Sequence, residues 1–234
     1  EVEAGEIVVI QHPLSGELDV ITTPGTYSQY LGKATHYKRR TQIWFSIMED
    51  QGDTSDQSIQ IRFNDGCHAT ISGSVSMELP LDKKSMKALH NNFGSQEAIE
   101  HDLVTTVIQK AVFMCGPLMS SKESYAEKRN ALIAFIEDQA SKGVYKTIQV
   151  ETKSIDALTN AEKVVTIVEI RKDKTGKYLR QETSPIERYS IGLSNLSINS
   201  IDYDGEVEKQ IKSQQSNIVQ MLLQQRNHLS IFSV

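Results

Sequence analysis

The feature that most constrains this chain is a long alternation of apolar and polar residues that ends at Leu79. A period of two places successive side chains on opposite faces of a β-strand, so one face is expected to pack and the other to meet water. The apolar positions are Cys67, Ala69, Ile71, Gly73, Val75, Met77 and Leu79, and the polar positions are His68, Thr70, Ser72, Ser74, Ser76 and Glu78.

The turn that precedes this strand fixes how the strand pairs. A two-residue loop would pair Phe63 with His68 and set an apolar face against a polar one. A three-residue loop, Asn64-Asp65-Gly66, pairs Phe63 with Cys67 instead, and its last residue is a glycine, which tolerates the left-handed conformation that such loops need. The sequence therefore predicts a hairpin with one buried face. The same register pairs Ile61 with Ala69 and Ile59 with Ile71.

The composition is that of a globular protein. The chain has 234 residues, of which 38% are hydrophobic and 24% charged, enough for one large domain or two small ones. A net charge of -5 argues against nucleic acid as a partner. No stretch has the ~20 apolar residues that a membrane-spanning helix needs. Cys67 and Cys115 fall at apolar positions and are expected in the core, with a disulfide between them left open.

Elements of both kinds are predicted on either side of the hairpin. A helical period follows it, with Asp82, Ser95 and Ser120 as candidate N-caps and Gly94 and Gly143 as stops. Strands then return, and the chain ends in a helix. This order predicts an α+β fold with antiparallel strands, a central group of helices and the start of a long C-terminal helix. The predicted strands are Ile7–Ile10, Glu17–Ile21, Thr41–Met48, Val144–Val150, a hairpin of Val164–Ile170 with Tyr178–Leu179, and Ser190–Tyr203; the predicted helices are Asp82–Gly94, Ser95–Cys115, Ser120–Gly143 and Glu206–His228.

Catalytic and metal-binding motifs are missing from the sequence. The six histidines make neither His-x-x-x-His nor His-Glu-x-x-His, and there is no Gly-x-Ser-x-Gly elbow or phosphate-binding glycine loop. We therefore expect no enzymatic activity, no catalytic residue, no metal and no cofactor. An active site assembled from residues far apart in the sequence is the remaining alternative.

Two segments are candidates for interaction surfaces. A loop after Pro24-Gly25 carries Tyr27, Tyr30 and Leu31, which either fold over a sheet edge or touch a bilayer, where tyrosine suits the half-wet interface. The terminal helix has apolar residues at helical spacing that could form a seam with a second copy. Its candidate contact residues are Val207, Ile211, Ile218 and Leu222.

Several of these motifs, taken in order, resemble the SPFH or band 7 family of stomatins, prohibitins and flotillins. The resemblance covers about residues 5 to 212. The quoted segments are Gly5-Glu6-Ile7-Val8-Val9, Thr23-Pro24-Gly25-Thr26-Tyr27, Asn64-Asp65-Gly66, the helix Ser95–Cys115, the strand from Tyr189-Ser190-Ile191-Gly192-Leu193 to Ile198-Asn199-Ser200-Ile201-Asp202, and Val207-Glu208-Lys209-Gln210-Ile211.

The resemblance implies a domain over residues 1–205, followed over 206–234 by the start of a C-terminal helix with coiled-coil character. It also implies a membrane-associated scaffold, held by an N-terminal anchor outside this chain, that assembles into a homo-oligomeric ring or cage. Such scaffolds organise lipids and hold membrane proteins, including proteases.

Two departures from the family keep a second function open. The stretch 152–187 is inserted relative to the shortest members and is expected to be an extra hairpin on an edge of the sheet. The long Ala/Glu-rich coiled coil of many members is absent between Lys212 and Val234. The alternative is therefore a soluble adaptor that binds one protein partner through the edge of the inserted hairpin.

Overall fold

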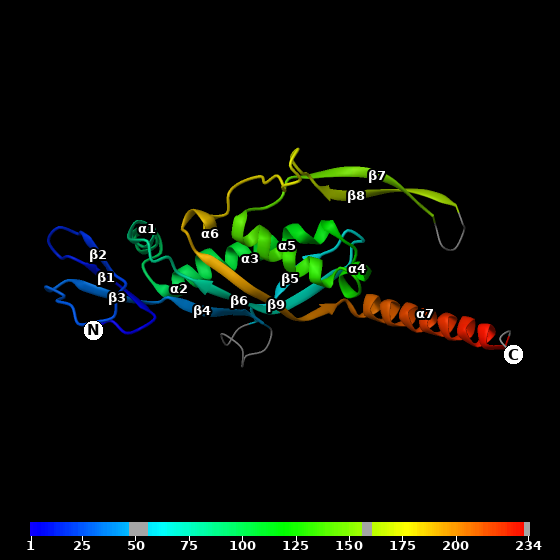
Figure 1. The fold of residues 1–234 in the computed structure, drawn as a ribbon, viewed down its shortest axis with the longest axis horizontal. Helices are drawn as coiled ribbons and strands as arrows, with labels where there is room; N and C mark the ends of the chain where they lie inside the picture. The colour runs from blue at the N-terminus through cyan, green and yellow to red at the C-terminus, as the bar shows by residue number, and fades with distance from the viewer. Residues whose placement is uncertain (47–55, 156–160, 232–234) are drawn as a thin grey trace.

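The computed structural model describes residues 1–46, 56–155 and 161–231. It is an α+β fold built on antiparallel sheets, as the element order predicts. A small sheet lies at one end of the molecule, a larger sheet with its helices occupies the middle, and a long helix projects at the other end (Figure 1).

The small N-terminal sheet has the strand order β2-β1-β3. The predicted first two strands are confirmed as β1 (Glu6–Gln11) and β2 (Leu18–Ile21). The third strand, β3 (Lys33–Lys38), was not predicted, and Tyr37 is its one fully buried side chain. Because its remaining residues are half-buried or exposed, β3 shows no apolar alternation.

The predicted hairpin is confirmed with its register. Strand β5 (Ile59–Arg62) pairs with β6 (His68–Glu78), setting Ile59 opposite Ile71 and Ile61 opposite Ala69. The Phe63 amide donates to the Cys67 carbonyl across 2.9 Å, and Gly66 has a φ of 82°. The loop therefore spans three residues, as the match of apolar faces requires.

Strand β6 is the centre of the larger sheet. On one side it pairs with β4 (Arg40–Phe45) as well as β5, and on the other with β9 (Gly192–Tyr203) along almost its whole length. The register of β6 against β9 shifts twice, so the pair is irregular. The predicted strand 41–48 ends at Phe45, and residues 47 and 48 lie outside the described part of the chain.

Helices pack on the apolar face of this sheet (Figure 1). The predicted caps are confirmed: Asp82 accepts from the Ser85 amide, Gly94 is left-handed, and Ser120 and Glu123 form a capping box. The bounds are α1 (Lys83–Phe93), α2 (Gln96–Ala98), the π-helical η2 (Ile99–Thr105), α3 (Thr106–Cys115), the 3-10 turn η3 (Gly116–Leu118), α4 (Ser121–Tyr125), α5 (Arg129–Lys142) and α6 (Pro185–Arg188).

One predicted helix is in fact two. The sequence predicts a single helix from Ser120 to Gly143, but α4 ends at Tyr125 and α5 begins at Arg129. Ala126 has a φ of -105° and a ψ of -98°, which no helix accommodates.

The insertion forms a separate arm, and here two predictions are wrong. Strand β7 (Thr147–Ile155) pairs with β8 (Glu162–Ile170) as a two-stranded sheet, so among the described residues the arm does not extend the main sheet. The predicted pairing of 164–170 with Tyr178 is reduced to a single bridge between Lys172 and Tyr178. Strand β8 takes β7 as its partner because nine residue pairs are available there.

The last element is α7 (Gly205–Ile231), a 27-residue helix that extends the predicted one. It leaves the body directly after β9 and projects away from it (Figure 1). Cys67 and Cys115 are both buried and both free, which answers the question of a disulfide between them.

Candidate interaction surfaces

The first candidate surface is the tip of the N-terminal sheet. Gln11 at the end of β1 is opposite both Leu18 of β2 and Lys33 of β3, so the two loops that precede these residues lie at the same end of the sheet. We call this end the apolar tip and define it as Leu14, Tyr30 and Leu31. Leu14 is 101% exposed, Leu31 is 94% exposed and Tyr30 is 75% exposed.

The loop that carries two of these residues has an unusual backbone. Tyr30 and Leu31 have φ angles of 44° and 62°, and the Gly32 amide donates to the Gln29 carbonyl across 2.8 Å. Two consecutive positive φ angles are typical of a type I′ turn, in which glycine and asparagine are favoured. Bulky residues are strained there, and strain of this kind concentrates at functional sites.

Tyr27 of the same predicted group lies differently. Its hydroxyl donates to the Thr23 carbonyl across 3.0 Å, and its ring lies over Gly25. The side chain is therefore held by its own loop and is less exposed than the apolar tip. Leu14 was not among the predicted residues, although its position just before the Ser15-Gly16 turn is a signal for an exposed loop residue.

The second candidate surface is α7. Of its predicted contact residues, Val207 is half-buried against the core and Ile211 is buried within its own chain. Ile218 and Leu222 are 57% and 59% exposed, beyond the body of the protein. Only these two of the four are free to meet a second copy. The neighbouring exposed apolar residues of the helix are Val219, Met221 and Leu223.

The third candidate surface is the arm, whose base is clamped to α5 by a polar cluster. The Asp138 carboxylate accepts from Arg180 across 2.7 Å and from the Tyr145 hydroxyl across 2.5 Å, with Lys142 3.3 Å away. Arg180 also donates to the Gly143 carbonyl across 2.7 Å. These residues join the end of α5 to both chain segments that flank the arm.

The cluster shifts the protonation of its members. Burial alone would raise the pKa of Asp138, but the hydrogen bond from Tyr145 and the bond and charge of Arg180 outweigh it, so the pKa lies below its ordinary value. Burial and the Asp138 charge raise the pKa of Tyr145. Asp138 is therefore ionised and Tyr145 neutral near pH 7, which is the pattern of a structural clamp. Because Asp138 and Arg180 are 42 residues apart, no local motif signals the pair.

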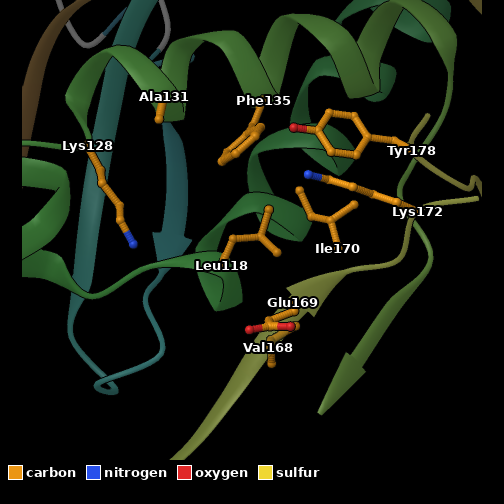
Figure 2. Close-up of a pocket in the computed structure, with 9 residues that line it drawn as sticks. All are labelled: Leu118, Lys128, Ala131, Phe135, Val168, Glu169, Ile170, Lys172 and Tyr178. Atoms are coloured by element: carbon orange, nitrogen blue, oxygen red, sulfur yellow. The ribbon is translucent and has the colours of Figure 1, made fainter. Parts of the chain in front are cut away.

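A pocket of about 570 Å³ lies between the arm and α5, a volume typical of ligand sites. Figure 2 shows Phe135 and Ala131 above it, Leu118 and Ile170 beneath them, and Lys128 and Lys172 on opposite sides. The remaining lining residues are Val168, Glu169 and Tyr178. This pocket was not predicted from the sequence, because it forms only where the arm returns over α5.

Within residues 1–46, 56–155 and 161–231, no group of three or more His, Cys, Asp or Glu side chains could hold a metal ion. In the same described ranges, none of the helices combines the length and the apolar character needed to cross a bilayer. The chain matches no family model, and no curated protein matches it.

Proposed function

We propose that this chain is an SPFH-type domain that works as an oligomeric scaffold on a membrane surface. The observation that carries the proposal is the placement of two exposed apolar surfaces at opposite ends of the molecule, the apolar tip and the outer part of α7 (Figure 1). One end is suited to a bilayer and the other to a second copy. The element order and the hairpin register support the family resemblance on which the proposal also draws.

The proposed membrane contact is the apolar tip. A tyrosine and two leucines at the end of a sheet can enter the interface, where aromatic rings sit at the level of the headgroups. Lys33 lies two residues after Leu31 and is exposed, so a cation accompanies the apolar residues. The contact is shallow, because only two loops contribute to it.

The proposed subunit contact is the helical seam of Ile218 and Leu222. These residues are four apart and share one face of α7, as residues of a coiled-coil seam do. Two apolar positions form a weak contact, which a closed ring or cage would strengthen by multivalency. Such an assembly would organise lipids and hold membrane proteins, including proteases, whereas nucleic acid is disfavoured by the net charge of -5.

Vesicle flotation tests the membrane part of this proposal. The protein is mixed with phosphatidylcholine vesicles containing phosphatidylglycerol, and the fraction that floats is measured for the parent, for the double variant Leu14→Ser/Leu31→Ser and for Phe113→Ser. Phe113 is an exposed apolar residue on α3, outside the tip, and is the matched control. We expect the double variant to lose most of its flotation and the control to keep it. Equal flotation of all three proteins would remove the tip from the mechanism.

A second function is favoured by one specific observation. The arm is a two-stranded ribbon, and such a ribbon alone is only marginally stable in water. It keeps an apolar pocket at its base and strand edges that could accept another strand. We propose as the alternative a soluble adaptor that binds one partner protein through this arm. A protein that stays monomeric and does not float with vesicles would favour the adaptor function.

A further inference from the structure

The pocket beneath the arm lies along an open strand edge. Val168, Glu169 and Ile170 are consecutive residues of β8, and all three line it. Val168 and Ile170 alternate along the chain and share one face of the strand, and Glu169 between them points to the other face, so the cavity borders this face and also reaches the edge of the strand. Among the described residues, the lining includes none from β7, so the edge concerned is the one of β8 that faces away from β7.

The backbone of β8 offers hydrogen bonds at this edge. The Arg171 amide donates to the Lys146 carbonyl, and Thr147 is opposite Ile170. Hydrogen-bonded and non-hydrogen-bonded pairs alternate along an antiparallel ladder. Because the pair of Lys146 and Arg171 is hydrogen-bonded, the next pair, Thr147 with Ile170, is not, and neither is Gln149 with Val168 two residues further on. The amide and carbonyl groups of Val168 and Ile170 therefore point away from β7, toward the pocket side.

The pocket also combines apolar walls with cations. Leu118, Phe135 and Ile170 provide apolar surface, and in Figure 2 the ammonium group of Lys172 points into the space beside them. The Lys172 ammonium group lies 5.5 Å from the centre of the Tyr178 ring, a cation–π contact. Lys128, across the pocket, is held by Glu123 at 2.7 Å.

We propose that this pocket binds an extended polypeptide segment of a partner protein, which adds a strand to the open edge of β8. The proposal rests on the adaptor function and specifies its partner. The segment carries β-branched apolar residues, one of which enters the pocket between Leu118 and Phe135. It also carries a carboxylate that pairs with Lys172, whereas Lys128 across the pocket keeps Glu123 as its partner. Glu169 lies away from Lys172 in the lining, so the carboxylate is expected beside Lys172.

The chemistry favours a peptide over a free amphiphile. A fatty acid would use the apolar walls and the lysines but would leave the amide groups of the edge without a partner. Backbone groups that are taken out of water without a partner are unfavourable, whereas an added strand pairs them. The backbone of the ligand is therefore the feature that distinguishes the two classes.

Fluorescence anisotropy with a defined probe tests the proposal on the full chain without vesicles. The probe is a fluorescein-labelled peptide of alternating valine and glutamate, and two matched peptides replace glutamate by lysine or carry N-methyl groups on alternate amides. We expect the parent to bind the first peptide at least ten times more tightly than either matched peptide. A failure here leaves vesicle flotation untouched, so it is separable from a failure of the scaffold proposal.

Three protein variants locate the binding site. Ala131→Trp fills the pocket and Lys172→Ala removes its cation, and each should weaken the binding of the valine–glutamate peptide at least tenfold. Lys84→Ala, an exposed lysine on α1, is the control and should bind like the parent. Circular dichroism establishes that each variant is folded before its affinity is measured.

Three outcomes would overturn the proposal. The first is no binding of the peptide at any concentration up to about 1 mM, which is the weak end of specific recognition. The second is binding that Ala131→Trp leaves intact. The third is tight binding of dodecanoate, measured by calorimetry, together with equal affinity for the plain and the N-methylated peptide. That combination would show that the pocket binds a free amphiphile.

Discussion

Arg180 donates a hydrogen bond to the Asp138 carboxylate across 2.7 Å, and this pair attaches the arm to the end of α5. Arg180 also lies over the ring of Tyr145, 5.2 Å from its centre, so one guanidinium contacts three parts of the junction when its bond to Gly143 is included. A two-stranded arm has little core of its own. Its orientation over the pocket therefore depends on this polar clamp.

Replacing Arg180 should loosen the arm. We expect Arg180→Met to lower the free energy of unfolding by about 1–3 kcal/mol, because it leaves the half-buried Asp138 with fewer partners. Urea unfolding followed by the fluorescence of Trp44 measures this loss. Arg171→Met is the matched control, an exposed arginine in the same junction for which the described residues include no ion-pair partner. Equal losses in the two variants would contradict the role of the clamp.

The clamp should make the thermal stability of the protein depend on pH. The pKa of Asp138 is lower in the folded protein than its ordinary value, so its ionised form stabilises the fold above the unfolded value of about 3.9. That stabilisation is lost as the pH falls through the folded pKa. We expect Asp138→Asn to melt at a lower temperature than the parent at pH 7, and the gap to close as the pH is lowered below about 4. Thermal unfolding between pH 7 and pH 3 measures the gap, and a gap of constant size would refute the prediction.

Gly73 should not tolerate a side chain. A Cβ at this position would lie 2.1 Å from the Ser197 carbonyl oxygen of β9 and 2.9 Å from the ring of Phe45. The carbonyl group cannot move away without breaking the ladder between β6 and β9. We therefore expect Gly73→Ala to lower the free energy of unfolding by about 1–3 kcal/mol. In Gly192→Ala, the matched change in β9, the new atom would meet Glu78 at an ordinary 3.7 Å. We expect the melting temperature to fall in the first variant and to stay within a degree or two in the second.

Charges on the outer part of α7 should prevent self-association. We expect Ile218→Glu/Leu222→Glu to reduce the mass measured by light scattering to that of a single chain, because two carboxylates would face the same seam in the partner. Ser216→Glu/Gln220→Glu adds the same charge on the opposite side of the helix and should leave the mass unchanged. If the parent protein is already monomeric, Ile218 and Leu222 do not form a subunit contact, and this part of the proposed function is wrong.

The local parts of the fold are determined by the sequence alone. The register of the β5–β6 hairpin follows from the side-chain alternation and one glycine. Asp82 and Gly94 determine the two ends of α1, and the Ser120–Glu123 capping box determines the start of α4. All of these depend on residues within a few positions of one another, where steric and hydrogen-bonding preferences are strong. The α+β class follows from the order of such elements.

The tertiary structure decided the features that join distant segments. Strand β8 could pair with a neighbour on either side, and the longer ladder with β7 prevailed over the short turn that ends at Tyr178. Ile211 and Ile218 are both isoleucines on one face of α7. Only Ile211 is buried, because the first turns of α7, directly after β9, pack against the body of the protein. The clamp of Asp138 with Arg180 and the pocket with Lys172 likewise depend on where the arm returns over α5. Such contacts depend on packing and charge summed over the whole chain, so a local sequence pattern does not predict them.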